Sequence, residues 1–270
     1  MIDWSRLAEP QVDGYDSAVI LKFAMAEVSP RYGAIYTRRP VTGALTLFNG
    51  AVAVRHLHPV APPPVGPRHV NGPLDVANAH QAIDYLQAWP IAHRQFITLM
   101  DTLNPIVPAA QDTSMSVSAS HSEEELFGTM YATCHDPVSL AECFVHEMAH
   151  HKLRALGVGI SRARTLVSNS IDDLYVSPII KDRLRPMTAV LHATYALIHI
   201  TALDIHVLQR GQQGAEQDRF QKNLSRNLAR LHEGLNEVRH HIQVGANGRA
   251  FLDGLDDWAE RVVKAGQSLV

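Results

Sequence analysis

An H-E-x-x-H motif, running from His146 to His150, constrains this chain more than any other feature of its sequence. On an α-helix the spacing of four places both imidazoles on one face, one turn apart, where they can share a metal ion. Glu147 would lie beside that face, within reach of a water bound to such an ion. Apolar residues surround the motif at helical spacing, as in a buried amphipathic helix: Leu140, Ala141, Phe144, Val145, Met148, Ala149 and Leu153.

Local signals predict where this helix begins and ends. Asp136 is a suitable cap and Pro137 suits the first turn, whereas Gly157 marks the end. An alternative interpretation is two histidines on an ordinary amphipathic helix, because the chain has 16 histidines among 270 residues. The broad apolar surface around the motif favours the metal site.

Hydrophobic periodicity predicts an α+β chain that is mainly helical, with a few strands in the first half. Helices are expected over 16–28, 74–89, 90–103, 161–174, 186–209, 215–243 and 250–266, and strands over 45–48, 51–54, 115–120 and 126–134. Asn49-Gly50 indicates a two-residue hairpin turn, and the proline-rich stretch 59–73 a loop. We expect one catalytic domain over 1–270, with an α/β subregion over 1–65 and a helical metal-binding core over 136–270, in which the metal helix faces a second long helix.

Composition excludes several classes of protein. A net charge of −3 does not indicate a nucleic-acid surface, and no apolar run is expected to span a membrane. The N-terminus lacks the basic and apolar segments of a signal peptide. Cys134 and Cys143 are too few for a disulfide scaffold, and Cys143 is interpreted as a buried small residue. A cytoplasmic location is therefore the expectation.

A third protein ligand would distinguish between the possible chemistries. The metzincin extension requires Gly at position 153 and His at 156, where this chain has leucines. A gluzincin would supply a downstream Glu, but no Glu occurs between Glu147 and Glu216. Neither of these zinc-peptidase patterns is complete in this sequence.

Three residues downstream of the motif are candidates for that ligand. Asp172 and Asp173 could serve, although helix capping or a solvated surface explains them equally well. His192 lies in an otherwise apolar helix, where an unpaired imidazole would be costly, and it is nearest to a basic loop that could form the mouth of a site. His199 and His206 follow at seven-residue intervals and are interpreted as core or rim histidines with hydrogen-bond partners. His151 points about 100° away from His150 and is a poor ligand.

Several of these segments together resemble a known family. Leu140 to His150, Ser177-Pro178, Arg185-Pro186 and Val190 to Ala196 are similar to the H-E-x-x-H-motif proteins of ribosomal-peptide natural-product clusters, with Ala193 where that family usually has Gly. The family is understood as Fe(II)- and 2-oxoglutarate-dependent peptide β-hydroxylases. The resemblance implies His146, His150 and His192 as metal ligands, Arg185 (with Arg183 beside it) as the partner of the co-substrate carboxylate, and a precursor peptide as substrate.

Three functions therefore stand as hypotheses. The first is an Fe(II)/2-oxoglutarate-dependent oxygenase that hydroxylates a carbon of a peptide, with Glu147 orienting groups at the site. The second is a zinc metallopeptidase in which Glu147 deprotonates a metal-bound water. The third is a metal-free helical binding module. Iron, zinc or no metal in the purified protein would separate the three.

Overall fold

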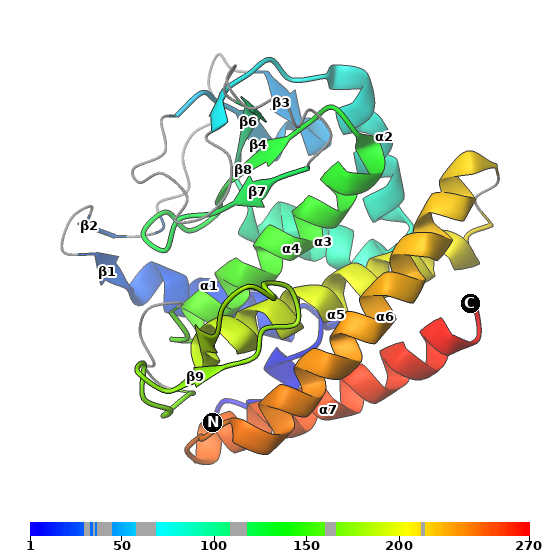
Figure 1. Ribbon diagram of the computed structural model, residues 1–270. Coiled ribbons are helices and arrows are strands. Elements are labelled where there is room, and N and C mark those ends of the chain that lie inside the picture. The colour runs from blue at the N-terminus through cyan, green and yellow to red at the C-terminus, as the bar shows by residue number, and fades with distance from the viewer. Residues whose placement is uncertain are drawn as a thin grey trace. The chain divides into compact units, whose positions relative to one another are not determined.

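The computed structural model of the chain (Figure 1) describes residues 1–29, 33, 34, 36, 45–57, 69–108, 118–159, 166–211 and 214–270. Two compact units can be recognised in it. One is Ala24–His151, and the other joins Met1–Phe23 to Lys152–Val270. The fold class is α+β, as predicted, with a mixed sheet in the first unit and mainly helices in the second. That the chain is one catalytic domain stays a prediction.

A mixed β-sheet forms the centre of the Ala24–His151 unit. Its strands follow the order β3-β4-β6-β8-β7, and β5 adds to β6. β4, β6 and β8 run parallel, whereas β3, β5 and β7 pair antiparallel with their neighbours. The strands are β3 (Thr46–Leu47), β4 (Val52–Val54), β5 (His69–Asn71), β6 (Thr102–Pro108), β7 (Ser120–His121) and β8 (Thr129–Thr133). The unit also contains the pair β1 (Val28–Ser29) and β2 (Gly33–Ala34), and the helices α2 (Val76–Gln87) and α3 (Pro90–Leu99).

Strand β6 corrects the prediction that a helix continues to residue 103. The chain leaves α3 at Leu99 and is already a strand at Thr102, and the strand passes through Pro105. A proline has no N–H for a β-ladder and is rare inside a central strand. Here β4 pairs with β6 up to Leu103 and β5 pairs only from Ile106, so the missing N–H falls between the two partners.

The predicted hairpin of residues 45–54 is present, but its turn is longer than two residues. Leu47 pairs with Val52, so four residues connect β3 to β4 instead of the Asn-Gly dipeptide alone. They form a short 3-10 turn in which Asn49 has a φ of 54° and Gly50 a φ of 93°. Asn49 and Gly50 tolerate that left-handed conformation well, whereas Phe48, which also has a φ of 54°, adopts it at a cost.

The H-E-x-x-H segment is helical, as predicted, within α4 (Pro137–Ala155). Asp136 caps the helix, because its carboxylate accepts a hydrogen bond of 2.7 Å from the Ser139 N–H. Gly157 ends it with a φ of 88°. The apolar face of α4 contributes to an aromatic cluster in which Phe144 lies 5.4 Å from Phe48 and 4.9 Å from Phe96, measured between ring centroids. This packing fixes the rotation of α4 within its unit.

The second unit is built around a buried helix, α5 (Met187–Gln209), which packs against α6 (Ala215–His241) and α7 (Ala246–Gln267). α1 (Tyr15–Ala26) begins in this unit, and β9 (Leu174–Tyr175) pairs with β10 (Arg185–Pro186). The start of the chain is held against α5 by the Tyr195 hydroxyl, which donates 2.7 Å to the Ala8 carbonyl. Gly254 allows close approach there, because a Cβ would lie 2.0 Å from the Ser5 carbonyl oxygen.

A buried ion pair lies in the same unit. Lys152, the first residue of α4 that belongs to it, reaches Asp16 of α1 across 3.4 Å, and both side chains are fully buried. Burial lowers the pKa of Lys152, and the negative charge of Asp16 opposes that shift. Cations of this kind are rarely buried without a partner, so the pair is a strong constraint on local packing.

Other predictions differ from the structure in this part of the chain. A helix over 161–174 is wrong for residues 166–174, which form a loop and β9; the preceding residues lie outside the described ones. The predicted loop over 59–73 also lies largely outside the described residues, and His69–Asn71 form β5.

By length and composition α5 could cross a membrane, whereas the sequence analysis expected no apolar run long enough to do so. However, 89% of its apolar window is buried, as in the core helix of a globular protein.

Candidate metal centre

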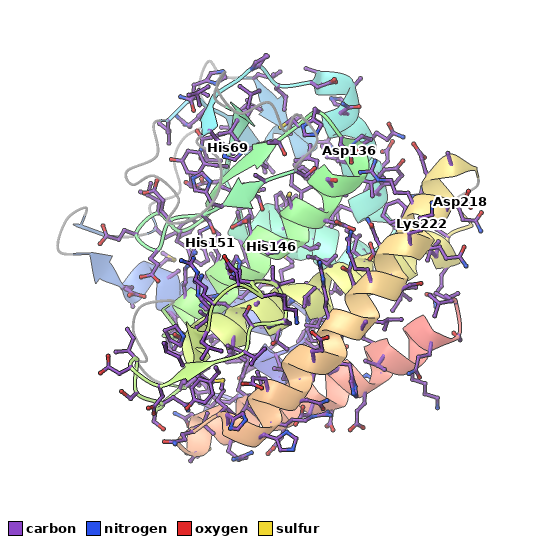
Figure 2. All side chains as sticks on the ribbon, viewed as in Figure 1. His69, Asp136, His146, His151, Asp218 and Lys222 are labelled. Carbon is purple, nitrogen blue, oxygen red and sulfur yellow. The ribbon has the colours of Figure 1, made fainter. Side chains whose placement is uncertain are left out.

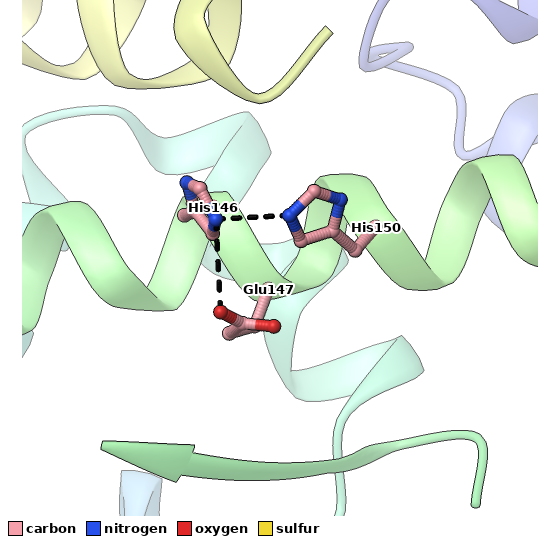
Figure 3. Close-up of side chains that lie close together, drawn as sticks. All are labelled: His146, Glu147 and His150. Atoms are coloured by element: carbon pink, nitrogen blue, oxygen red, sulfur yellow. Dashed lines mark hydrogen bonds and ion pairs between the residues drawn. The ribbon is translucent and has the colours of Figure 1, made fainter. Parts of the chain in front are cut away.

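Three potential metal donors converge on α4 (Figure 3). The Nε2 atoms of His146 and His150 are 2.9 Å apart, and one Glu147 carboxylate oxygen lies 3.7 Å from the His146 Nε2. The three donor atoms lie within 4.8 Å of one another. The two imidazoles are half-buried, whereas Glu147 is fully buried. The helical spacing of the motif therefore produces the convergence expected from the sequence.

The donor set fits a divalent transition metal. Two nitrogen donors on one ion lie roughly 3.0–3.4 Å apart if each metal–nitrogen bond is about 2.1 Å long, and the observed separation is close to that range. Without an ion, the same contact is a hydrogen bond in which one ring donates to the other. Neutral imidazole suits iron, zinc and other divalent metals.

Two serines, which the sequence analysis missed, hold Glu147. The Ser120 hydroxyl donates 2.6 Å to one carboxylate oxygen, and the Ser122 hydroxyl donates 2.5 Å to the other. Side chains alternate along a strand, so both serines lie on one face of β7 and its continuation. His121 lies on the opposite face, stacked on Tyr131 with ring centroids 4.5 Å apart. The alternation was visible in the sequence, but the partner of that face was not.

His151 and Cys143 are next to the motif on α4 and serve other purposes. The His151 Nε2–H donates 2.9 Å to the Thr129 carbonyl, and its ring contacts Phe127. That His151 is a poor ligand stays a prediction; Figure 2 labels His151 with His146 on α4. Burial raises the pKa of the Cys143 thiol well above its ordinary value. The thiol therefore stays protonated at neutral pH and behaves as the small buried residue expected from the sequence.

The candidate third ligand, His192, lies on α5 in the other unit. It is buried, and its Nε2–H donates 2.8 Å to the Val158 carbonyl. Asp172 and Asp173 are exposed in the loop before β9. None of these residues is tested as a ligand by the geometry of either unit, and His192 stays a prediction.

The other two histidines singled out in the sequence, His199 and His206, also lie on α5. His199 is fully buried, bonds through Nδ1 to the Tyr195 carbonyl at 2.8 Å, and has its ring 4.8 Å from that of Trp258. Burial lowers the pKa of the half-buried His206.

The two arginines proposed for the co-substrate differ in exposure. Arg185 is half-buried on β10, paired in register with Tyr175, and its pKa is lowered first by burial and then by the nearby charge of Arg183. Arg183 is exposed in the loop between β9 and β10. A half-buried guanidinium is better placed than an exposed one to hold a carboxylate, because its hydrogen bonds are less screened by water.

No model of a known protein family matches the chain, and no curated protein matches it. The residues and their geometry therefore carry the functional argument.

Proposed function

We propose that the protein is a mononuclear Fe(II)- and 2-oxoglutarate-dependent oxygenase that hydroxylates a carbon of a ribosomally made precursor peptide. Its metal would be held by His146 and His150 of α4, and by His192 of α5, the second long helix of the proposed site. When bound, Fe(II) and 2-oxoglutarate would allow dioxygen to react: one oxygen atom would enter the succinate formed as the 2-oxo acid loses CO₂, and the other would enter the peptide C–H bond as a hydroxyl group. A cytoplasmic location belongs to the same proposal.

The observation that carries the choice of chemistry is the double hydrogen bond on Glu147. In a hydrolase this residue must take a proton from water. Here each carboxylate oxygen accepts a hydrogen bond from a serine hydroxyl, and these two contacts fix the orientation of a fully buried side chain. The arrangement favours a fixed carboxylate that orients groups over one that shuttles protons.

A second line of support is the donor set itself. Two or three protein ligands leave open positions on an octahedral ion, as a 2-oxo acid and dioxygen require. Neither of the two zinc-peptidase patterns considered is complete, because the chain lacks both the metzincin extension and a Glu between Glu147 and Glu216. The segments around His192 and Arg185 resemble those of the peptide hydroxylases. These observations favour the oxygenase over the zinc peptidase.

The co-substrate provides the most direct test. Anaerobic addition of Fe(II) and 2-oxoglutarate should give a weak visible charge-transfer band that zinc does not give. Arg185→Ala should raise the concentration of 2-oxoglutarate needed for that band by roughly 10- to 150-fold, because a charge-assisted pair of about 1.5–3 kcal/mol is lost. Arg183→Ala is the matched control and should do much less. Cleavage of a peptide by the zinc-loaded protein, with no oxygen consumed, would contradict the proposal.

Glu147→Gln separates the two mechanisms kinetically. Removing a general base typically lowers the rate about 100- to 10,000-fold. If Glu147 only orients groups, the glutamine variant should lose much less, with most of the change in KM for the peptide. The measurement is kcat and KM of the wild type and of Glu147→Gln on the peptide that the protein converts, whether the product is hydroxylated or cleaved. A loss of kcat in the range of a missing base would favour the peptidase.

A further inference from the structure

Glu147 has an unusual combination of burial and charge-stabilising contacts. Its side chain is fully buried, and an isolated buried carboxylate is strongly unfavourable. Two hydroxyl groups compensate, one on each oxygen, and both come from the edge strand β7 and the residue that follows it. A strand 25 to 27 residues earlier in the chain thus sets the orientation of a group in the middle of the metal helix.

The direction of these hydrogen bonds limits what the serines can do. Each hydroxyl has one hydrogen, and each gives it to Glu147, so only lone pairs remain for other partners. The serines are therefore not free acids or nucleophiles. Their effect on the site passes through the carboxylate.

We propose that Ser120 and Ser122 are positioning residues that hold the Glu147 carboxylate beside the metal donors and thereby set the affinity of the metal centre. This inference rests on the proposed function, because it requires a metal at His146 and His150. Hydrogen-bond partners behind the groups of a metal site typically contribute 10- to 100-fold to metal affinity. The Glu147 carboxylate lies 3.7 Å from the His146 Nε2. The two serines would therefore keep its negative charge at a fixed position beside the proposed ion.

The test uses the full chain and Co(II), whose visible absorption reports both binding and coordination. Ser120→Ala and Ser122→Ala should each raise the Co(II) dissociation constant about 10-fold, and the double variant about 100-fold. Ser122→Thr retains a hydroxyl and should bind like the wild type, whereas Ser122→Val has the same shape without the hydroxyl and should bind like the alanine variant. Ser118→Ala is the matched control, because Ser118 lies two residues before Ser120 and is also half-buried.

A double-mutant cycle shows whether the serines act through Glu147. In a Glu147→Gln background the serine substitutions should change the Co(II) dissociation constant less than about 2-fold. An equal loss in both backgrounds, or none in the wild-type background, would overturn the positioning role. Thermal unfolding without metal checks that each variant folds, and if the double variant does not, the single variants and Ser122→Thr decide. If the wild type binds no Co(II), the metal centre is wrong, and the role of the serines with it.

Discussion

Replacing His150 with alanine is expected to leave the purified protein without the proposed metal and without the proposed activity, and His146→Ala should do the same. Each variant removes one of the two imidazoles whose Nε2 atoms are 2.9 Å apart. A single remaining histidine on α4 cannot chelate an ion. Because residues behind a metal ligand already contribute 10- to 100-fold, loss of the ligand itself should lower the affinity by at least about 100-fold.

Metal analysis and Co(II) titration of the purified variants measure this loss. His135→Ala is the matched control, because this histidine belongs to the same unit and is exposed. Normal metal content in His150→Ala would exclude the site. His192→Ala should lower the affinity as well. If it binds normally while Asp172→Ala does not, the third ligand has been misassigned.

The second large effect is expected on stability, at the buried pair of Lys152 and Asp16. Asp16→Ala removes the carboxylate that lies 3.4 Å from the buried Lys152 ammonium. Breaking a buried pair by removing one partner typically costs about 3–5 kcal/mol, or about 6–20 °C in the midpoint of thermal unfolding. The exposed pair of Arg239 and Asp256 is the control, because removing one partner of a surface pair costs about 0–1 kcal/mol. Equal losses for Asp16→Ala and Asp256→Ala would contradict the argument.

The double variant Asp16→Leu with Lys152→Met tests whether the pair itself is needed. Replacing a buried ion pair by apolar residues of similar size is often neutral or stabilising, so this variant should regain most of the stability lost in Asp16→Ala. It should also change the dependence on pH. Because burial lowers the pKa of Lys152, the unfolded chain binds more protons just below pH 10.4. Stability from this group therefore rises with pH through that interval, and the double variant should lack this rise.

The ends of helices could be predicted because they depend on neighbouring residues. Asp136 caps α4 and Gly157 ends it, and both positions follow from capping chemistry that acts over three or four residues. The convergence of His146 and His150 is equally local, since it requires only a helix. Pairing between distant segments was harder. Pro105 suggested the end of an element, but it lies inside β6, because that strand changes partners there.

In the candidate site, too, the local features could be predicted and the contacts between distant segments could not. The donors on α4 were identified from spacing alone, whereas Ser120 and Ser122 were missed. Nothing in the sequence indicates which element faces a short run of small polar residues, since that depends on the order of strands in the sheet. His192 and Arg185 came from a resemblance and have defined surroundings in their own unit, but their roles remain predictions.

The two thiols give the molecule an internal chemical label. Cys134 and Cys143 are both buried and unpaired with each other, and burial raises the pKa of Cys134 to about 12. Only a thiolate reacts rapidly with alkylating agents, so the folded chain should be labelled slowly at neutral pH. Cys143 lies one turn before His146, and its labelling therefore reports how often the proposed metal helix opens to water. The labelling rate of Cys143 with and without metal would show how much an ion reduces the opening of α4. This measurement requires no knowledge of the substrate.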